Sequence, residues 1–346
     1  MTEHEQVDWE VMGEEETDET GLSRRELFIK GGLLTAGAAF LGSPVAAARA
    51  AAKSPAAAQA SSTIAVVTHG AGDAFWAVVK KGALKAGKDL GVRVNYSESF
   101  NNPQKQAQLI STAVARKPAG IVASAPNPSA LKDALRRARN ARIPIITINS
   151  GVQAFKSLGA LTHVGQTETI AGRGAGQKLK GAGAKKLLVI IHEQGNIGLE
   201  QRYSGAKSGF GGKTSRLQVK GVTDISTTTN QIKTKLRADR SIDAILALNP
   251  QVGVAARDAA AGANSKAKIA TFDLSSDVIK AIQRGQILFA VDQQQYEQGY
   301  LPIVFLYLYK YNLNTVGGGQ PVLTGPGYVE KSNAAKVAAY ARRGTR

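Results

Sequence analysis

Residues 63–92 read Thr63-Ile-Ala-Val-Val-Thr-His-Gly-Ala-Gly-Asp-Ala-Phe-Trp-Ala-Val-Val-Lys-Lys-Gly-Ala-Leu-Lys-Ala-Gly-Lys-Asp-Leu-Gly-Val92, and the prediction of the fold starts from this stretch. Its first part, Ile64–Thr68, is apolar and β-branched, which is typical of a strand. The apolar residues that follow recur with helical spacing, at Phe75, Val78, Val79, Ala83, Ala86 and Leu90. Gly91 can end this helix. The stretch therefore predicts a strand followed by a helix with one apolar side.

The same unit, a short apolar run followed by a helical period, recurs about every 20 to 30 residues as far as Asn312. Such alternation is the pattern of a parallel α/β fold. The runs are continuously apolar, which indicates strands covered on both faces. The predicted strands are Ile64–Thr68, Val92–Tyr96, Gly120–Ala123, Ile145–Ile148, Leu187–Ile191, Leu217–Gly221, Ala244–Leu248, Ile269–Phe272 and Leu288–Val291.

Two lobes explain nine strands more simply than one sheet does. Residues 150–173 interrupt the rhythm after the fourth strand, and residues 317–327 are rich in Gly and Pro, as expected for a connection between lobes. Three helix starts carry an Asn cap followed by Pro, at Asn102-Pro103, Asn127-Pro128 and Asn249-Pro250. We therefore expect an α/β protein of two Rossmann-like lobes with parallel sheets.

The N-terminus predicts export. Ser23-Arg24-Arg25-Glu26-Leu27-Phe28-Ile29-Lys30 precedes a weakly apolar, Ala-rich stretch from Gly31 to about Ala48, which resembles a twin-arginine signal. Residues 1–60 are thus expected to be an acidic leader and signal region, read by the twin-arginine export machinery. The mature protein would lie in the periplasm or on the cell-envelope exterior. Cysteine is absent, which excludes disulfides, a thiol nucleophile and thiolate metal sites.

The charge of the chain is strongly positive, at +18. Residues 1–60 hold five Lys or Arg and ten Asp or Glu, so residues 61–346 would carry about +23. The basic residues are scattered along predicted helices and are not clustered with aromatic residues, and the chain is expected to be exported. A solvated basic surface, and no nucleic-acid partner, is therefore the prediction.

Polar side chains follow the predicted strands, where ligands bind in open α/β sheets. They are His69, Asp73, Ser124, Asn149, Ser150, His192, Glu193, Gln194, Asn196, Asp224, Asn249, Asp273, Asp292 and Gln293. Helix capping alone would explain about half of them. Phe75 and Trp76 add flat apolar faces for the C–H surface of a sugar ring. Because neighbouring helical residues point in different directions, one of these two is expected to be core.

No catalytic or metal-binding pattern is present. The four histidines lack the H-E-x-x-H spacing, and there is no G-x-S-x-G elbow. Glu193 and Asp224 could imitate the acid and base of a glycosidase, but nothing in the sequence brings them together. We expect no enzyme activity, no cofactor and no metal.

From Thr63 to about Lys331 the chain resembles the ribose- and galactose-type periplasmic binding proteins, the type I fold shared with the ligand-binding domains of LacI-like repressors. The resemblance rests on the order and spacing of Thr63-Ile-Ala-Val-Val, Asp73-Ala-Phe75-Trp76, Asn101-Asn102-Pro103, Ile143–Asn149, Gly195–Arg202, Ala244–Asn249, Phe272-Asp273 and Gln293–Gly299. It implies lobes of residues 61–164 plus 294–323 and 165–293 plus 324–346, with hinge crossings near Gly165, Gln293 and Thr324. The ligand-binding residues it implies are Asp73, Phe75, Trp76, Asn149, Arg202, Asn249, Asp273 and Gln293.

The resemblance implies a solute-binding protein that delivers a small-molecule sugar or polyol to the permease of an ABC importer. Asn149-Ser150 stands where ribose binders carry Asp-Arg, and Pro250 follows Asn249 where many relatives have an acidic residue. A polyol, another pentose or a hexose is therefore favoured over ribose. Two alternatives stay open, a sensor for a membrane receptor and an exported glycan hydrolase. A repressor is disfavoured, because an export signal stands where a DNA-binding module would be.

Overall fold

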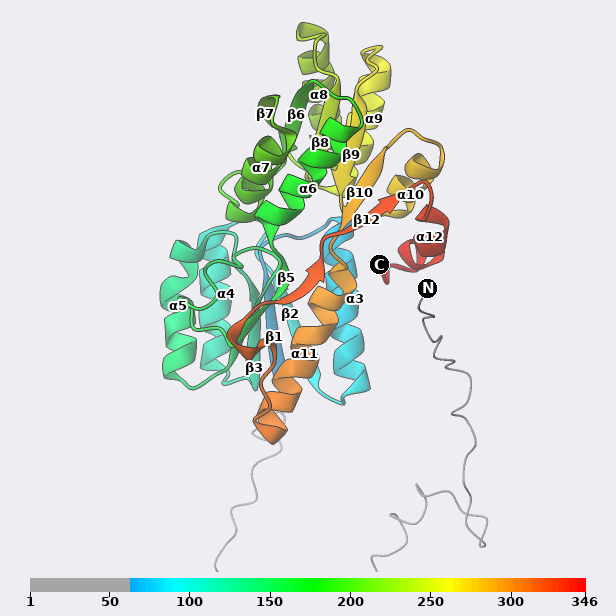
Figure 1. The fold of residues 1–346 in the computed structure, drawn as a ribbon. Helices are drawn as coiled ribbons and strands as arrows, with labels where there is room; N and C mark the ends of the chain where they lie inside the picture. The colour runs from blue at the N-terminus through cyan, green and yellow to red at the C-terminus, as the bar shows by residue number, and fades with distance from the viewer. Residues whose placement is uncertain (1–62) are drawn as a thin grey trace, which may run out of the picture. The chain divides into compact units, whose positions relative to one another are not determined.

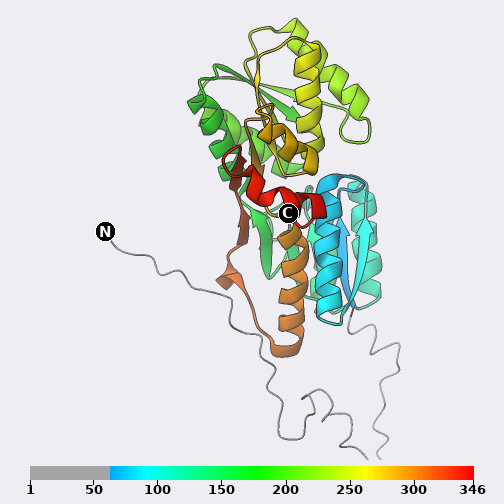
Figure 2. The ribbon, with the colours of Figure 1, turned by 90° about the vertical axis from the view of Figure 1, so that its right-hand side faces the viewer.

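The computed structural model describes residues 63–346, and in these residues two six-stranded sheets each carry helices on both faces (Figure 1, Figure 2). The first sheet has the order β11-β5-β4-β3-β1-β2 and is parallel throughout. Its strands are β1 (Thr63–Thr68), β2 (Arg93–Glu98), β3 (Gly120–Ser124), β4 (Ile145–Ile148), β5 (Thr162–Gln166) and β11 (Val322–Gly325). The predicted acidic leader and twin-arginine signal lie outside the described residues.

The second sheet has the order β12-β10-β9-β8-β6-β7 and is parallel except for the edge pair β10–β12. Its strands are β6 (Lys186–Ile191), β7 (Lys213–Gln218), β8 (Ala244–Ala247), β9 (Lys268–Phe272), β10 (Phe289–Asp292) and β12 (Gly327–Glu330). The predicted α/β class of two lobes with parallel sheets is confirmed.

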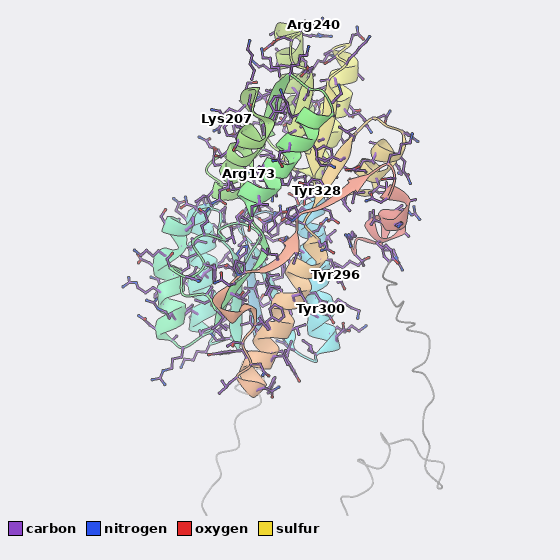
Figure 3. The ribbon with its side chains drawn as sticks, viewed as in Figure 1. Arg173, Lys207, Arg240, Tyr296, Tyr300 and Tyr328 are labelled. Carbon is purple, nitrogen blue, oxygen red and sulfur yellow. The ribbon has the colours of Figure 1, made fainter. Side chains whose placement is uncertain are left out.

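The helices of the first sheet bury its two faces in separate cores. On one face lie α3 (Ala74–Asp89) and α11 (Gln295–Asn312), and on the other lie α4 (Pro103–Ala115) and α5 (Pro128–Asn140). Tyr296 and Tyr300, labelled in Figure 3, stack along α11 with ring centroids 5.9 Å apart. The Tyr300 hydroxyl donates to Asp89 Oδ2 at 3.0 Å and so links α11 to α3.

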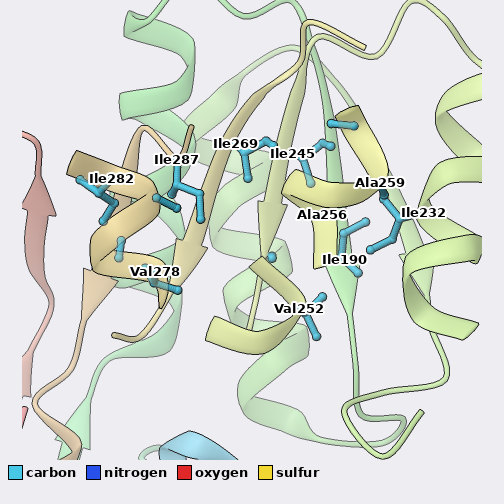
Figure 4. Packing of buried hydrophobic residues seen from close by; sticks show 14 of the residues in the cluster. Ile190, Ile232, Ile245, Val252, Ala256, Ala259, Ile269, Val278, Ile282 and Ile287 are labelled. Atoms are coloured by element: carbon cyan, nitrogen blue, oxygen red, sulfur yellow. The ribbon is translucent and has the colours of Figure 1, made fainter. Parts of the chain in front are cut away.

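Strand β6 shows how the second sheet is covered on both faces. Leu187, Val189 and Ile191 pack under α6 (Glu168–Gly181) and α7 (Ile197–Phe210). Leu188 and Ile190 point the other way, into a cluster seen in Figure 4. The elements over that cluster are α8 (Ile225–Ala238), α9 (Pro250–Gly262), α10 (Ser276–Gln283) and α12 (Ala334–Arg343). A continuously apolar strand is therefore buried on both faces, as predicted.

The chain crosses between the sheets at three places, after β5, after β10 and between β11 and β12. One buried side chain ties the crossings together. Thr324 Oγ1 lies 2.7 Å from the carbonyl oxygen of Gln293 and 3.2 Å from that of Gly165. The predicted three-stranded hinge is present. A short 3-10 turn, Gly317–Gly319, lies between α11 and β11. None of the helices within residues 63–346 is long and apolar enough to cross a membrane.

The local predictions succeeded where a buried pattern or a cap determines the structure. Asn102, Asn127 and Asn249 each cap a helix that begins at the following proline. The bounds of the strand predicted at Leu217–Gly221 are wrong, because β7 (Lys213–Gln218) is a half-exposed edge strand whose polar residues begin earlier in the chain. Strands β5, β11 and β12 were not predicted at all.

Helices α6 and α7 approach closely because glycines line their contact. A Cβ at Gly172 would overlap the carbonyl oxygen of Arg202, and one at Gly205 would overlap that of Thr169. The main chains of the two helices are therefore held side by side, which positions Arg202 against the start of α6.

Gly172→Ala is expected to lower the free energy of unfolding by about 1–3 kcal/mol, because the added methyl must push α6 and α7 apart. Gly181→Ala, in the last turn of α6, is the matched control, since a Cβ there meets no atom. It should be neutral or stabilising by up to about 1 kcal/mol. Urea unfolding of both variants checks this. Equal effects of the two substitutions would contradict the packing argument.

Candidate functional site

A cavity lies at the carboxyl ends of strands from both sheets, and its space of about 320 Å³ is partly open to solvent. It is lined by His69, Asp73, Phe75, Trp76, Asn149, Ser150, His192, Glu193, Asn196, Leu199, Arg202, Leu248, Asn249, Asp273 and Gln293. The structure thus brings together all eight residues that the sequence suggested.

Phe75 and Trp76 form the aromatic wall of the cavity. Their ring centroids lie 4.9 Å apart in a T-shaped arrangement, and Trp76 meets His69 in the same way at 4.8 Å. Both rings are buried and also belong to the core under α3 and α11. The expectation that only one of them is core is therefore wrong. A Cβ at Gly70 would overlap the Trp76 ring, so glycine is what allows Trp76 to lie against this loop.

Asp73 caps α3 and faces the cavity at the same time. Its Oδ1 accepts a hydrogen bond from the Trp76 backbone N–H at 2.8 Å. Burial raises the pKa of Asp73 to about 6, against the lowering effect of that hydrogen bond. Asp73 therefore caps α3 and also lines the cavity.

A chain of hydrogen bonds joins the ends of β4, β9 and β10. Asn149 Nδ2 donates to Gln293 Oε1 at 3.4 Å, and Gln293 Nε2 donates to Asp273 Oδ1 at 2.8 Å. Asn149 and Asp273 adopt left-handed backbone conformations, with φ of 59° and 67°, which Asn and Asp tolerate better than most residues. Burial raises the pKa of Asp273 to about 7, although Arg202 and Gln293 act in the opposite direction.

Arg202 is the cationic residue of the site and is paired before any ligand arrives. Its Nε lies 2.6 Å from Glu168 Oε2 and its Nη2 2.9 Å from Glu168 Oε1. Its Nη1 donates to the Leu248 carbonyl at 3.3 Å and lies 4.0 Å from Asp273 Oδ2. Burial alone would lower the pKa of Arg202, but the carboxylate of Glu168 raises it overall. The guanidinium also stacks 4.4 Å from the centroid of the Phe272 ring.

Glu168 was missed by the sequence analysis. The polar residues suggested by the sequence all follow predicted strands, whereas Glu168 follows β5, which was not predicted. The polar residues of β5 that concealed it, Thr162, His163 and Gln166, are all buried. No apolar run marks such a strand.

His69, Glu193 and Asn196 connect loops of the two sheets beside the cavity. His69 Nε2 lies 3.4 Å from Glu193 Oε2 and 3.3 Å from Asn196 Nδ2. Asn196 Nδ2 donates to Glu193 Oε2 at 2.6 Å. Burial would raise the pKa of Glu193, but His69 and Asn196 lower it overall. Glu193 is therefore an ionised carboxylate at neutral pH.

Two hydrogen bonds donated by backbone N–H groups also bridge the sheets. Ile197 N–H donates to the Pro126 carbonyl at 3.0 Å, and Ala74 N–H donates to Gln251 Oε1 at 3.4 Å. The two halves of the cavity are thus in contact around it, which is a closed arrangement. Burial lowers the pKa of His192 to about 4, so this cavity residue is neutral at pH 7.

The remaining polar residues suggested by the sequence have structural roles. Asp224 is partly buried and caps α8 by accepting from Thr227 N–H at 3.0 Å, and it does not line the cavity with Glu193. Asp292 accepts from Arg346 Nε at 2.7 Å. Ser124 Oγ lies 2.7 Å from His69 Nδ1. Within residues 63–346 no three His, Asp or Glu side chains are grouped as a metal ion would require.

Comparison with known proteins agrees with this geometry. Residues 64–311 match the sequence model of the periplasmic binding protein domain. A carbohydrate transporter from Acidothermus cellulolyticus 11B, solved in complex with myo-inositol, is 41% identical with a TM-score of 0.81, covering 83% of this chain and 100% of that chain. A periplasmic sugar-binding protein from Legionella pneumophila is 26% identical with a TM-score of 0.71, covering 76% and 99%. The ribose import binding protein of Haemophilus influenzae is 26% identical over 253 residues, which are 71% of this chain and 85% of that protein.

Proposed function

This chain belongs to the periplasmic binding protein domain family, and we propose that it captures one monosaccharide or cyclic polyol for an ABC importer. The observation that carries the proposal is the cavity, in which an aromatic wall faces a ring of carboxylate, amide and guanidinium groups. A cyclic polyol has the same two-sided chemistry, with C–H faces and hydroxyl edges. Its faces would lie against Phe75 and Trp76, and its hydroxyls would both donate to and accept from the polar groups.

The proposed ligand-binding residues divide between the two sheets. Asp73, Phe75, Trp76 and Asn149 come from the first sheet, and Arg202, Asn249 and Asp273 come from the second, with Gln293 at a hinge crossing. A ligand held by both sets would stabilise the closed arrangement. The importer permease would then recognise the closed protein. Glu193 and Asp224 do not form the acid and base pair of a glycosidase, since Asp224 lies outside the cavity.

Uncharged groups at Asn149 and Ser150 support a neutral polyol as the ligand. Ser150 Oγ donates to Asn149 Oδ1 and to Asn196 Oδ1, each at 3.0 Å, so this corner presents amides and a hydroxyl. The similar transporter from Acidothermus cellulolyticus holds myo-inositol, which makes myo-inositol the first molecule to test. Relatives in this family are periplasmic, and we propose that residues 23–30 direct this chain there through the twin-arginine route.

Thermal melting of the purified chain against myo-inositol, hexoses, pentoses and linear polyols tests the function. A ligand at 100 times its Kd should add about 2.7 kcal/mol of stability. Asp73→Asn should weaken binding of that ligand by about 10- to 100-fold, because a charge-assisted hydrogen bond is lost while the helix cap is kept. Asp224→Asn, at a helix cap outside the cavity, is the control and should bind as the wild type does. If amino acids or nucleosides stabilise the protein and no polyol does, the proposed substrate class is wrong.

A further inference from the structure

Glu168 touches no part of the cavity surface yet controls the one guanidinium there. It is the first residue of α6 and is fully buried. Both of its oxygens are used, since Arg202 binds them in a bidentate pair and Gln166 Nε2 donates to Oε2 at 3.0 Å. A carboxylate in the first turn is also favoured by the helix dipole. Glu168 is therefore bound to Arg202 through both of its carboxylate oxygens.

The pair is already formed within one lobe. Glu168 begins α6 and Arg202 lies in α7, and these helices pack closely through their glycines, as Gly172 shows by lying against the Arg202 carbonyl. The crossing after β5 precedes Glu168. Lobe opening therefore does not separate the two charges, and an arriving ligand meets them as a neutral unit.

The other ionisable groups around the cavity are carboxyl groups and the imidazoles of His69 and His192. Arg202 is the only Lys or Arg among the cavity residues, whereas Asp73, Glu193 and Asp273 are carboxyl groups. An unpaired arginine would bind a ligand carboxylate in bidentate fashion. Here Nε and Nη2 are bound to Glu168 and Nη1 donates to Leu248, so the remaining N–H groups can serve hydroxyls without supplying a net charge.

We propose that Glu168 is a specificity-determining residue, which cancels the charge of Arg202 so that the cavity accepts uncharged polyols and rejects their carboxylated counterparts. The inference rests on the proposed function. Glu168 acts through Arg202 and is a positioning residue. Substitution of Glu168 should therefore change which ligands the protein binds, and not only its stability.

The experiment measures affinities of the full chain for three matched pairs, D-glucose with D-glucuronate, D-galactose with D-galacturonate, and myo-inositol with quinate. Calorimetry at pH 7.5 and low salt is suitable, since salt screens charge. The wild type is expected to bind at least one neutral member and to bind its acid at least about 100-fold more weakly. Glu168→Gln should lower the ratio of the affinity for the neutral member to the affinity for its acid by at least about tenfold. Glu168→Asp, which keeps the charge, should retain the wild-type ratio.

The double variant Glu168→Gln/Arg202→Gln removes both charges and is expected to keep the wild-type ratio. This double variant also tests the proposal if Glu168→Gln alone does not fold. If the double variant binds the acids more tightly than the wild type does, although it has no guanidinium, the proposal is overturned. A wild type that binds an acid as well as its neutral partner overturns it too, as does a folded Glu168→Gln with an unchanged ratio. If neither these probes nor any sugar or polyol of the melting series binds the wild type, the proposed function itself fails and this inference fails with it.

Discussion

Arg202→Met is expected to lower the free energy of unfolding by about 3–5 kcal/mol, because it leaves the carboxylate of Glu168 buried without its partner. Glu168 is 0% exposed and Arg202 4% exposed, so water cannot replace the lost guanidinium. The neighbouring Gln166 donor can compensate only one of the two carboxylate oxygens. Urea unfolding of the ligand-free protein at pH 7.5 measures the effect.

A second Arg–Glu pair in the same part of the fold provides the control. Arg216 on β7 and Glu200 on α7 also form a bidentate pair, with both distances 2.9 Å, but each side chain is 43% exposed. Arg216→Met should therefore cost less than about 1 kcal/mol. The double variant Glu168→Gln/Arg202→Met should recover most of the loss, because it leaves no buried charge. Equal costs at Arg202 and Arg216 would show that burial of the pair is not what matters.

The fold and the place of the site were predictable because both follow from local chemistry. An apolar run long enough for a strand, and an Asn-Pro start to a helix, are readable without any tertiary information, as Asn249-Pro250 illustrates. Parallel strands place their carboxyl ends at one edge, so Asp73 and Asn149 could be expected to lie together. That Asp273 of the other sheet lies in the same cavity was implied only by the resemblance to the ribose- and galactose-type binding proteins.

What sequence could not provide was the pairing between distant groups. The contact of His69 with Glu193 depends on how one lobe meets the other, and no periodicity encodes that distance. The hinge strands were hidden for another reason. They are short and carry polar residues such as His163 and Thr324, which are buried because the hinge satisfies most of their hydrogen bonds. Glu168 follows β5, one of these unpredicted strands, and was not predicted for the same reason.

Asp273→Asn is expected to remove a loss of stability that the wild type suffers as pH rises. The ordinary pKa of Asp is 3.8, and burial raises that of Asp273 to about 7 in the folded protein. Between these values the folded state keeps a proton that the unfolded state has released, so folding stability falls with increasing pH. From pH 5 to pH 8 the fall should be about 3 kcal/mol. The stability of wild type minus that of Asp273→Asn should decrease by this amount over the same range.

The difference between the two proteins isolates Asp273, because the other shifted groups are common to both. Asp73, with its pKa raised to about 6, contributes a fall of the same sign to each and cancels. Asp224 is the control, since hydrogen bonds from Thr227 lower its pKa and Asp224→Asn should remove no such loss. Urea unfolding at pH 5, 6, 7 and 8 gives both differences. Parallel curves for wild type and Asp273→Asn would mean that the Asp273 carboxyl is not held against its ionisation. Divergent curves would show that ionisation of Asp273 destabilises the folded protein. A ligand hydroxyl that donates to this carboxylate can offset that destabilisation on binding.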